Sequence, residues 1–107
     1  MFQKVRRYHR HSISGDAVIT RRDAGSPNKL TMRVNTISQG GMGFYSDVFI
    51  EKATPVSVEL LFHAGSMTER TVLAGRIASV CSQEKDYYMG ISFDSEISYD
   101  RFIEIIG

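Results

Sequence analysis

The sequence predicts a mainly β fold: a six-stranded antiparallel barrel with a flexible N-terminal arm and a short C-terminal helix. Apolar and polar residues alternate along much of the chain, which is the period of a strand with one buried face. Short segments rich in Gly, Ser and Asn separate these stretches and are typical of turns. Closure into a barrel is favoured because it removes exposed strand edges.

Six segments carry the strand signal. The alternation is clear in three of them and weaker in the other three, and three turn sequences lie between them. The clear segments are 30–35, 56–62 and 87–93, the weaker ones are 13–21, 42–45 and 71–80, and the turns are 24–28, 64–66 and 82–86.

The period changes at the C-terminus and predicts a helix there. Apolar residues recur at the i, i+3, i+4 and i+7 positions of a helical stripe. Ser98 is suited to the N-cap and Gly107 to the stop. A helix this short is not stable alone, so we expect its stripe to dock on the barrel. The stripe consists of Tyr99, Phe102, Ile103 and Ile106.

Composition limits the class of protein. A chain of 107 residues fits one domain, and its net charge of +1 argues against a general nucleic-acid binder. One cysteine, Cys81, excludes an internal disulfide and any cysteine metal cluster. No long apolar run or secretory signal is present, so we expect a cytoplasmic protein that does not insert into membranes.

Basic residues concentrate at the N-terminus, in Arg6-Arg7-Tyr8-His9-Arg10. A guanidinium pairs with two phosphate oxygens at once and also stacks on a purine face. This segment therefore suits a small ligand that carries both phosphates and guanines. A solvated basic arm without a ligand is the alternative. We assign residues 1–12 to a ligand-binding arm and residues 13–107 to the barrel and helix of the same domain.

A glycine-rich segment, residues 36–44, forms the second candidate site. Val34 and Ile37 have opposite parity on a strand, which predicts a bulge or tight turn near Thr36. Gly40, Gly41 and Gly43 permit close approach to the backbone. The Ser38 hydroxyl either contacts a ligand or caps a hairpin turn.

Together these segments resemble the PilZ family. The family pattern is an R-x-x-x-R arm before the barrel, then a [D/N]-x-S-x-x-G turn. This sequence has Arg6 and Arg10 at the arginine positions, and Ser38 to Gly41 match the S-x-x-G portion. Residues 89–93, Met-Gly-Ile-Ser-Phe, are similar to the family's late G-[I/V]-x-F strand. The resemblance covers essentially the whole chain.

The resemblance implies a cyclic di-GMP site and the residues that form it. Arg6 and Arg10 would wrap over the nucleotide, and Arg7 would add a phosphate or stacking contact. Ser38 and the backbone of Gly40 and Gly41 would meet a guanine. The family's Asp or Asn is replaced by Thr36, whose hydroxyl offers guanine no bidentate acceptor.

The sequence thus predicts a receptor or adaptor for cyclic di-GMP that signals to a protein effector. The alternative is a PilZ-fold interaction module with weak or no nucleotide binding, which the threonine at position 36 favours. A small RNA- or DNA-binding barrel is disfavoured, because such folds spread basic residues around exposed aromatic ones. We expect no enzymatic activity, no cofactor and no metal. His9 and His11 have no evident third ligand, and no catalytic triad is indicated.

Overall fold

The computed structural model describes residues 11–23 and 29–107 of the chain. Six strands and one helix account for most of the described residues. They are β1 (His11–Arg21), β2 (Lys29–Ser38), β3 (Gly41–Ser46), β4 (Pro55–Ala64), β5 (Met67–Ser82), β6 (Tyr87–Phe93) and α1 (Tyr99–Ile106). All six predicted strands are present, and β5 extends further at both ends than its alternation indicated.

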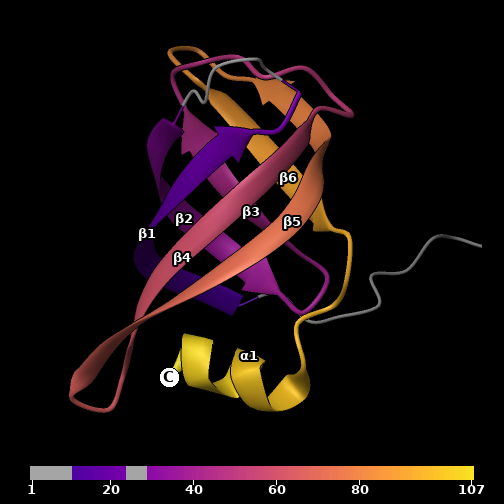
Figure 1. Ribbon diagram of the computed structural model, residues 1–107. Coiled ribbons are helices and arrows are strands. Elements are labelled where there is room, and N and C mark those ends of the chain that lie inside the picture. The colour runs from indigo at the N-terminus through magenta and orange to yellow at the C-terminus, as the bar shows by residue number, and fades with distance from the viewer. Residues whose placement is uncertain (1–10, 24–28) are drawn as a thin grey trace, which may run out of the picture.

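The strands form a closed barrel in the order β1-β2-β3-β6-β5-β4, with every neighbouring pair antiparallel. β1 closes the barrel because it pairs with β2 on one side and with β4 on the other. In Figure 1, β4 and β5 cross the front of the barrel and α1 lies below it. The predicted six-stranded antiparallel barrel is therefore confirmed.

The barrel interior is filled by the alternating apolar residues that predicted the strands. Val56, Val58 and Leu60 on β4 are at most 2% exposed, while the residues between them face outward. Leu61, which lies between the buried Leu60 and Phe62, is 41% exposed. The core consists of Ala17, Ile19, Met32, Val34, Ile37, Met42, Phe44, Ile50, Val56, Val58, Leu60, Phe62, Ile77, Met89, Ile91, Phe93, Ile97, Phe102 and Ile105.

A bulge interrupts β2 where the sequence analysis expected an irregularity. Val34 pairs with Phe44 and Thr36 pairs with Gly43, so Asn35 is the extra residue against β3. The bulge restores the inward direction at Ile37, which is fully buried. It also changes which side chains of β2 share the outer face.

Helix α1 has the predicted caps but a different docking face. The Ser98 hydroxyl accepts the Arg101 amide at 3.3 Å, and Gly107 ends the helix with φ of 86°. The predicted stripe was wrong in part, because Tyr99 and Ile103 are exposed while Phe102 and the unpredicted Ile105 are buried.

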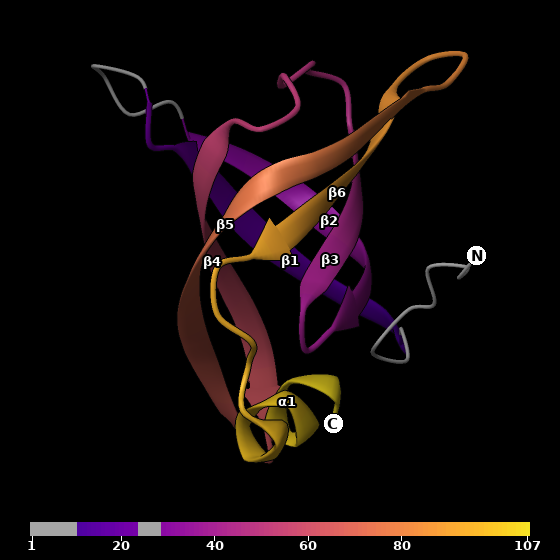
Figure 2. The same cartoon turned by 90° about the vertical axis from the view of Figure 1, so that its right-hand side faces the viewer.

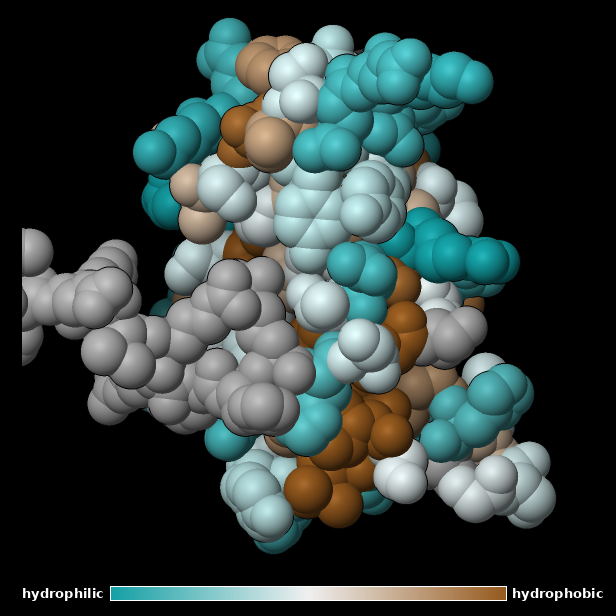
Figure 3. Space-filling view, turned by 180° about the vertical axis from the view of Figure 1, so that it is seen from behind, coloured by the Kyte–Doolittle hydropathy of each residue, from teal (hydrophilic) through white to brown (hydrophobic). Residues whose placement is uncertain are grey.

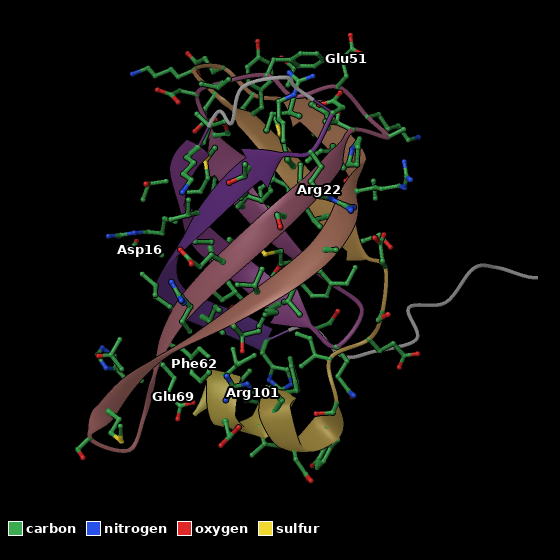
Figure 4. All side chains as sticks on the ribbon, viewed as in Figure 1. Asp16, Arg22, Glu51, Phe62, Glu69 and Arg101 are labelled. Atoms are coloured by element: carbon green, nitrogen blue, oxygen red, sulfur yellow. The ribbon has the colours of Figure 1, made fainter. Side chains whose placement is uncertain are left out.

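The anchoring of Arg101 explains the orientation of α1. Its guanidinium lies between the helix and the β4–β5 hairpin, near Phe62 and Glu69 (Figure 4). Nε donates to Thr71 Oγ1 at 2.8 Å and Nη1 to Glu69 Oε1 at 2.9 Å. Positions 101 and 105 share one helix face. These bonds therefore turn that face, rather than Tyr99 and Ile103, toward the barrel.

The β4–β5 hairpin extends past the barrel on the side of α1 (Figures 1 and 2). Its turn contains Gly65, whose φ of 65° is a left-handed conformation that glycine adopts without strain. The turn predicted at residues 64–66 is thus present. In the described part of the chain, no helix has the length and apolar character needed to cross a membrane.

Candidate functional site

The β2–β3 hairpin holds four of the predicted site residues together: Thr36, Ser38, Gly40 and Gly41. The Ser38 side chain is buried, accepts the Gly40 amide at 3.3 Å and donates to the Gly41 carbonyl at 3.4 Å. The hydroxyl therefore fixes the turn, which is the role that the turn alternative predicted. Both of its bonds lie within three residues of its own position, so they order the loop itself.

The turn is also held from the C-terminal side of the barrel. The amide of Phe93 donates to the Gly40 carbonyl at 2.9 Å, and Gln39 exchanges two hydrogen bonds with Ile97 at 2.8 and 2.9 Å. At Gly41 a Cβ atom would collide with the backbone carbonyl of Ile91. Strand β6 consequently approaches this turn more closely than a side chain would permit.

Asn35 and Thr36 both point to one polar group on the outer face of the barrel. The Asn35 amide nitrogen donates to the Tyr88 hydroxyl at 3.3 Å, and the Thr36 hydroxyl lies 3.4 Å from the same oxygen. On a regular strand consecutive side chains alternate between faces. The bulge is the reason that these two adjacent side chains reach one partner.

A pair of tyrosines borders this polar group. Tyr45 on β3 is the cross-strand neighbour of Tyr88 on β6. Their rings meet edge to face, with centroids 4.8 Å apart and planes at 64°. Tyr45 is 49% exposed, so the pair presents an aromatic surface beside Asn35 and Thr36. Such a surface suits the stacking of a nucleobase.

Strand β1 begins next to this hairpin. His11 pairs with Ile37, and Ser12 pairs with Thr36. Both residues belong to β1, although the sequence analysis placed them in the arm. The predicted ligand-binding arginines, Arg6, Arg7 and Arg10, lie outside the described residues.

Sequence reasoning missed Gly43, Tyr45 and Tyr88 as parts of this site. The alternation in 87–93 does place Tyr88 outward, and Gly43 belongs to the glycine cluster already noted. The sequence did not reveal the register between β2, β3 and β6. This register brings the three residues together.

A hollow lies at the α1 end of the barrel, between β1, the β4–β5 hairpin and the last turn of the helix. Its volume is about 350 Å³, and its lining includes Asp16, Phe62, His63 and Ile106. Seen from behind, apolar side chains gather on the lower half of the surface, near this end (Figure 3). None of the predicted site residues that the structure describes lines it. Among the described residues, no cluster of His, Cys, Asp and Glu is arranged to hold a metal ion.

Comparison with known proteins identifies the fold and the family. The family model of the PilZ domain matches residues 4–106. The chain belongs to the PilZ domain family. A comparison with curated proteins finds no match.

Solved structures of PilZ proteins share this fold at low sequence identity. The inhibitor of motility of Bacillus subtilis (MotI/DgrA) is 12% identical with a TM-score of 0.76; the match covers 96% of this chain and 49% of that one. The chain thus spans about half the length of that protein. The PilZ domain of CeSA from a cellulose-synthesizing bacterium is 15% identical, with a TM-score of 0.63 and coverage of 92% and 91%. The PilZ domain of YcgR from Escherichia coli, solved with c-di-GMP, is 16% identical, with a TM-score of 0.64 and coverage of 96% and 89%.

Proposed function

We propose that this PilZ chain is a receptor for cyclic di-GMP that acts on a partner protein as an adaptor. The observation that supports this proposal most directly is the pairing of His11 with Ile37 and of Ser12 with Thr36. It makes the arginine-rich segment run directly into the strand beside the Thr36–Gly41 hairpin. Family membership and the c-di-GMP bound in the YcgR domain support the same ligand class.

Chain connectivity limits how far the arginines can lie from the start of β1. Arg10 precedes His11 by one residue, a Cα step of about 3.8 Å, and Arg6 precedes it by five, at most about 18 Å. Two guanidinium groups four residues apart are suited to grip two phosphates or a phosphate and a guanine. The proposed ligand lies over Thr36, Ser38 and the glycine turn, with these arginines closing on it.

The protein effector is the second half of the proposal. Binding a nucleotide beside the turn changes the charge and shape of the outer face of β2, β3 and β6. A partner protein that contacts this face then binds more strongly or more weakly.

The compartment proposed for this receptor is the cytoplasm. The exposed, unpaired Cys81 is compatible with a reducing compartment.

An interaction module without useful nucleotide binding is the second candidate function. The observation that favours it is Thr36, which stands where the family pattern has Asp or Asn. Its hydroxyl is already close to Tyr88. Under this alternative the hairpin and the two tyrosines contact a protein directly.

Calorimetric titration distinguishes the two functions. We expect saturable binding of cyclic di-GMP at micromolar or lower concentration, and none of GTP or a short RNA. Arg10→Ala should weaken binding about ten- to a hundred-fold, as for loss of a charge-assisted contact. Arg70→Ala, which removes an exposed arginine paired with Glu59 on β4, is the matched control and should bind as wild type. A flat titration with the wild type excludes the receptor and leaves the interaction module.

A further inference from the structure

Tyr88 crosses β3 to reach β2. It projects from β6, and in the barrel β3 lies between β6 and β2. Its hydroxyl nevertheless lies 3.3 Å from Asn35 Nδ2 and 3.4 Å from Thr36 Oγ1. The ring passes over Gly43, where a Cβ atom would collide with the hydroxyl and lie 2.9 Å from Cζ. The missing side chain at position 43 is therefore what allows this contact.

The hydrogen bonds orient the Asn35 amide. Its nitrogen donates to the Tyr88 oxygen, and the Thr36 hydroxyl shares a hydrogen bond with the same oxygen in which either group can be the donor. The bond from the Asn35 nitrogen also fixes the opposite end of the planar amide, the carbonyl oxygen. Within the described residues, nothing hydrogen-bonds that carbonyl. Asn35 is half-buried, so this acceptor is held at the surface in a defined direction.

We infer that Asn35, positioned by Tyr88, reads the amino group of guanine in the site of this protein. The inference rests on the proposed function and assigns base recognition within it. The Asn35 carbonyl accepts from the exocyclic N2 amino group, a donor that guanine has and that hypoxanthine and adenine lack at this position. The bulged asparagine thereby supplies the acceptor that Thr36 does not.

We assign Tyr88 the role of a positioning residue, which orients Asn35 without contacting the base. Such a residue affects the selectivity between bases, whereas a residue with a purely structural role does not. A side chain that only packs on Gly43 contributes equally to the binding of any purine ligand. One that orients an acceptor toward the amino group changes the preference between ligands with and without that group. The ratio of two dissociation constants isolates this difference.

The experiment compares cyclic di-GMP with cyclic di-IMP, whose bases lack only the N2 amino group. Calorimetry on the full chain measures both ligands for the wild type, Asn35→Ala, Asn35→Asp and Tyr88→Phe. We expect the wild type to prefer cyclic di-GMP about ten-fold, as one lost hydrogen bond predicts. Asn35→Ala should abolish the preference, and Tyr88→Phe should reduce it. Asn35→Asp keeps an acceptor and should retain it.

Arg10→Ala separates failure of this inference from failure of the proposed function. If Arg10→Ala loses affinity while Asn35→Ala and Tyr88→Phe keep the wild-type ratio, the assignment of Asn35 is overturned and the receptor stands. If the wild type binds neither nucleotide, both are overturned. Tyr88→Phe retains its ring over Gly43, and melting curves of each variant verify that it is folded.

Discussion

The guanidinium of Arg101 lies over the ring of Phe62, with its central carbon 5.0 Å from the ring centroid. This contact joins α1 to the outer end of β4, and hydrogen bonds to Thr71 and Glu69 join the same group to β5. A single side chain thus connects the C-terminal helix to both strands of the extended hairpin.

Replacement of Arg101 by methionine should loosen α1. The variant keeps an apolar stem against Phe62 but loses every guanidinium bond, including that to the Arg70 carbonyl. We expect a lower melting temperature and faster amide exchange at Phe102 and Ile105, the buried residues of the helix. Arg70→Met, which removes an arginine from an exposed pair, is the control. Equal melting temperatures for the two variants would contradict the anchoring role.

Alanine at Gly41 and at Gly43 should have different effects, although both sites exclude a Cβ atom. At Gly41 the obstacle is the backbone carbonyl of Ile91, and at Gly43 it is the tip of the Tyr88 side chain. Backbone moves less readily than a side chain, so Gly41→Ala should lower the free energy of unfolding by about 1–3 kcal/mol. Gly43→Ala should cost less, because Tyr88 rotates away.

Urea unfolding compares the stability of these two variants, and calorimetry compares their affinity. A displaced Tyr88 no longer holds Asn35 and Thr36. Gly43→Ala should therefore weaken nucleotide binding more than its small loss of stability suggests. Greater destabilisation by Gly43→Ala than by Gly41→Ala would show that Tyr88 is rigidly held over β3.

The sequence predicted the barrel well, because burial imposes a period of two on strands. Val56, Val58 and Leu60 alternate in the sequence and are all buried. The same parity argument located the irregularity between Val34 and Ile37. Local signals also identified the caps Ser98 and Gly107, since each requires only a few neighbouring residues.

The features that the sequence predicted wrongly or did not predict depend on contacts between residues far apart in the chain. The docking face of α1 is set by Arg101 and its partners on β5, about thirty residues away in sequence. The contacts of Tyr88 depend on the registers of two strand pairs and on one bulge, and no local pattern encodes these. The sequence could therefore give the face of Tyr88 but not its partners.

Asp23 should titrate at a lower pH than an ordinary aspartate. Arg21 holds both of its carboxylate oxygens, at 3.1 and 3.2 Å, and this hydrogen bonding lowers the pKa of Asp23. A depressed folded-state pKa means that the pair stabilises the protein at neutral pH and stops doing so as the pH falls through that pKa. The effect on stability should be small, because both side chains are largely solvated.

Side-chain carboxyl NMR measures this titration directly. We expect the Asp23 midpoint to lie below the ordinary value of about 3.9 and to return toward it in Arg21→Gln. An unchanged Asp23 midpoint in Arg21→Gln would exclude the arginine as the cause.

Thr36→Asp should strengthen the binding of cyclic di-GMP. A carboxylate at this position regains the bidentate acceptor of the family pattern, and the nearby Tyr88 hydroxyl can donate to it. An added charge-assisted hydrogen bond to guanine is worth about 1–2 kcal/mol, or roughly five- to thirty-fold in affinity. Desolvation of the new charge opposes this gain, and Arg6 and Arg10 should offset it when they close on the ligand.

Thr36→Val is the matched control for this prediction, because it keeps the shape of the threonine and removes the hydroxyl. Calorimetry at two salt concentrations should show tighter binding for Thr36→Asp, with a gain that decreases at high salt as the added charge is screened. Thr36→Val loses the contact to Tyr88 and should bind more weakly than wild type. If neither variant changes the affinity, Thr36 does not face the nucleotide. Guanine recognition would then depend on Asn35 alone, and the family's acceptor position would have moved by one residue along the bulge.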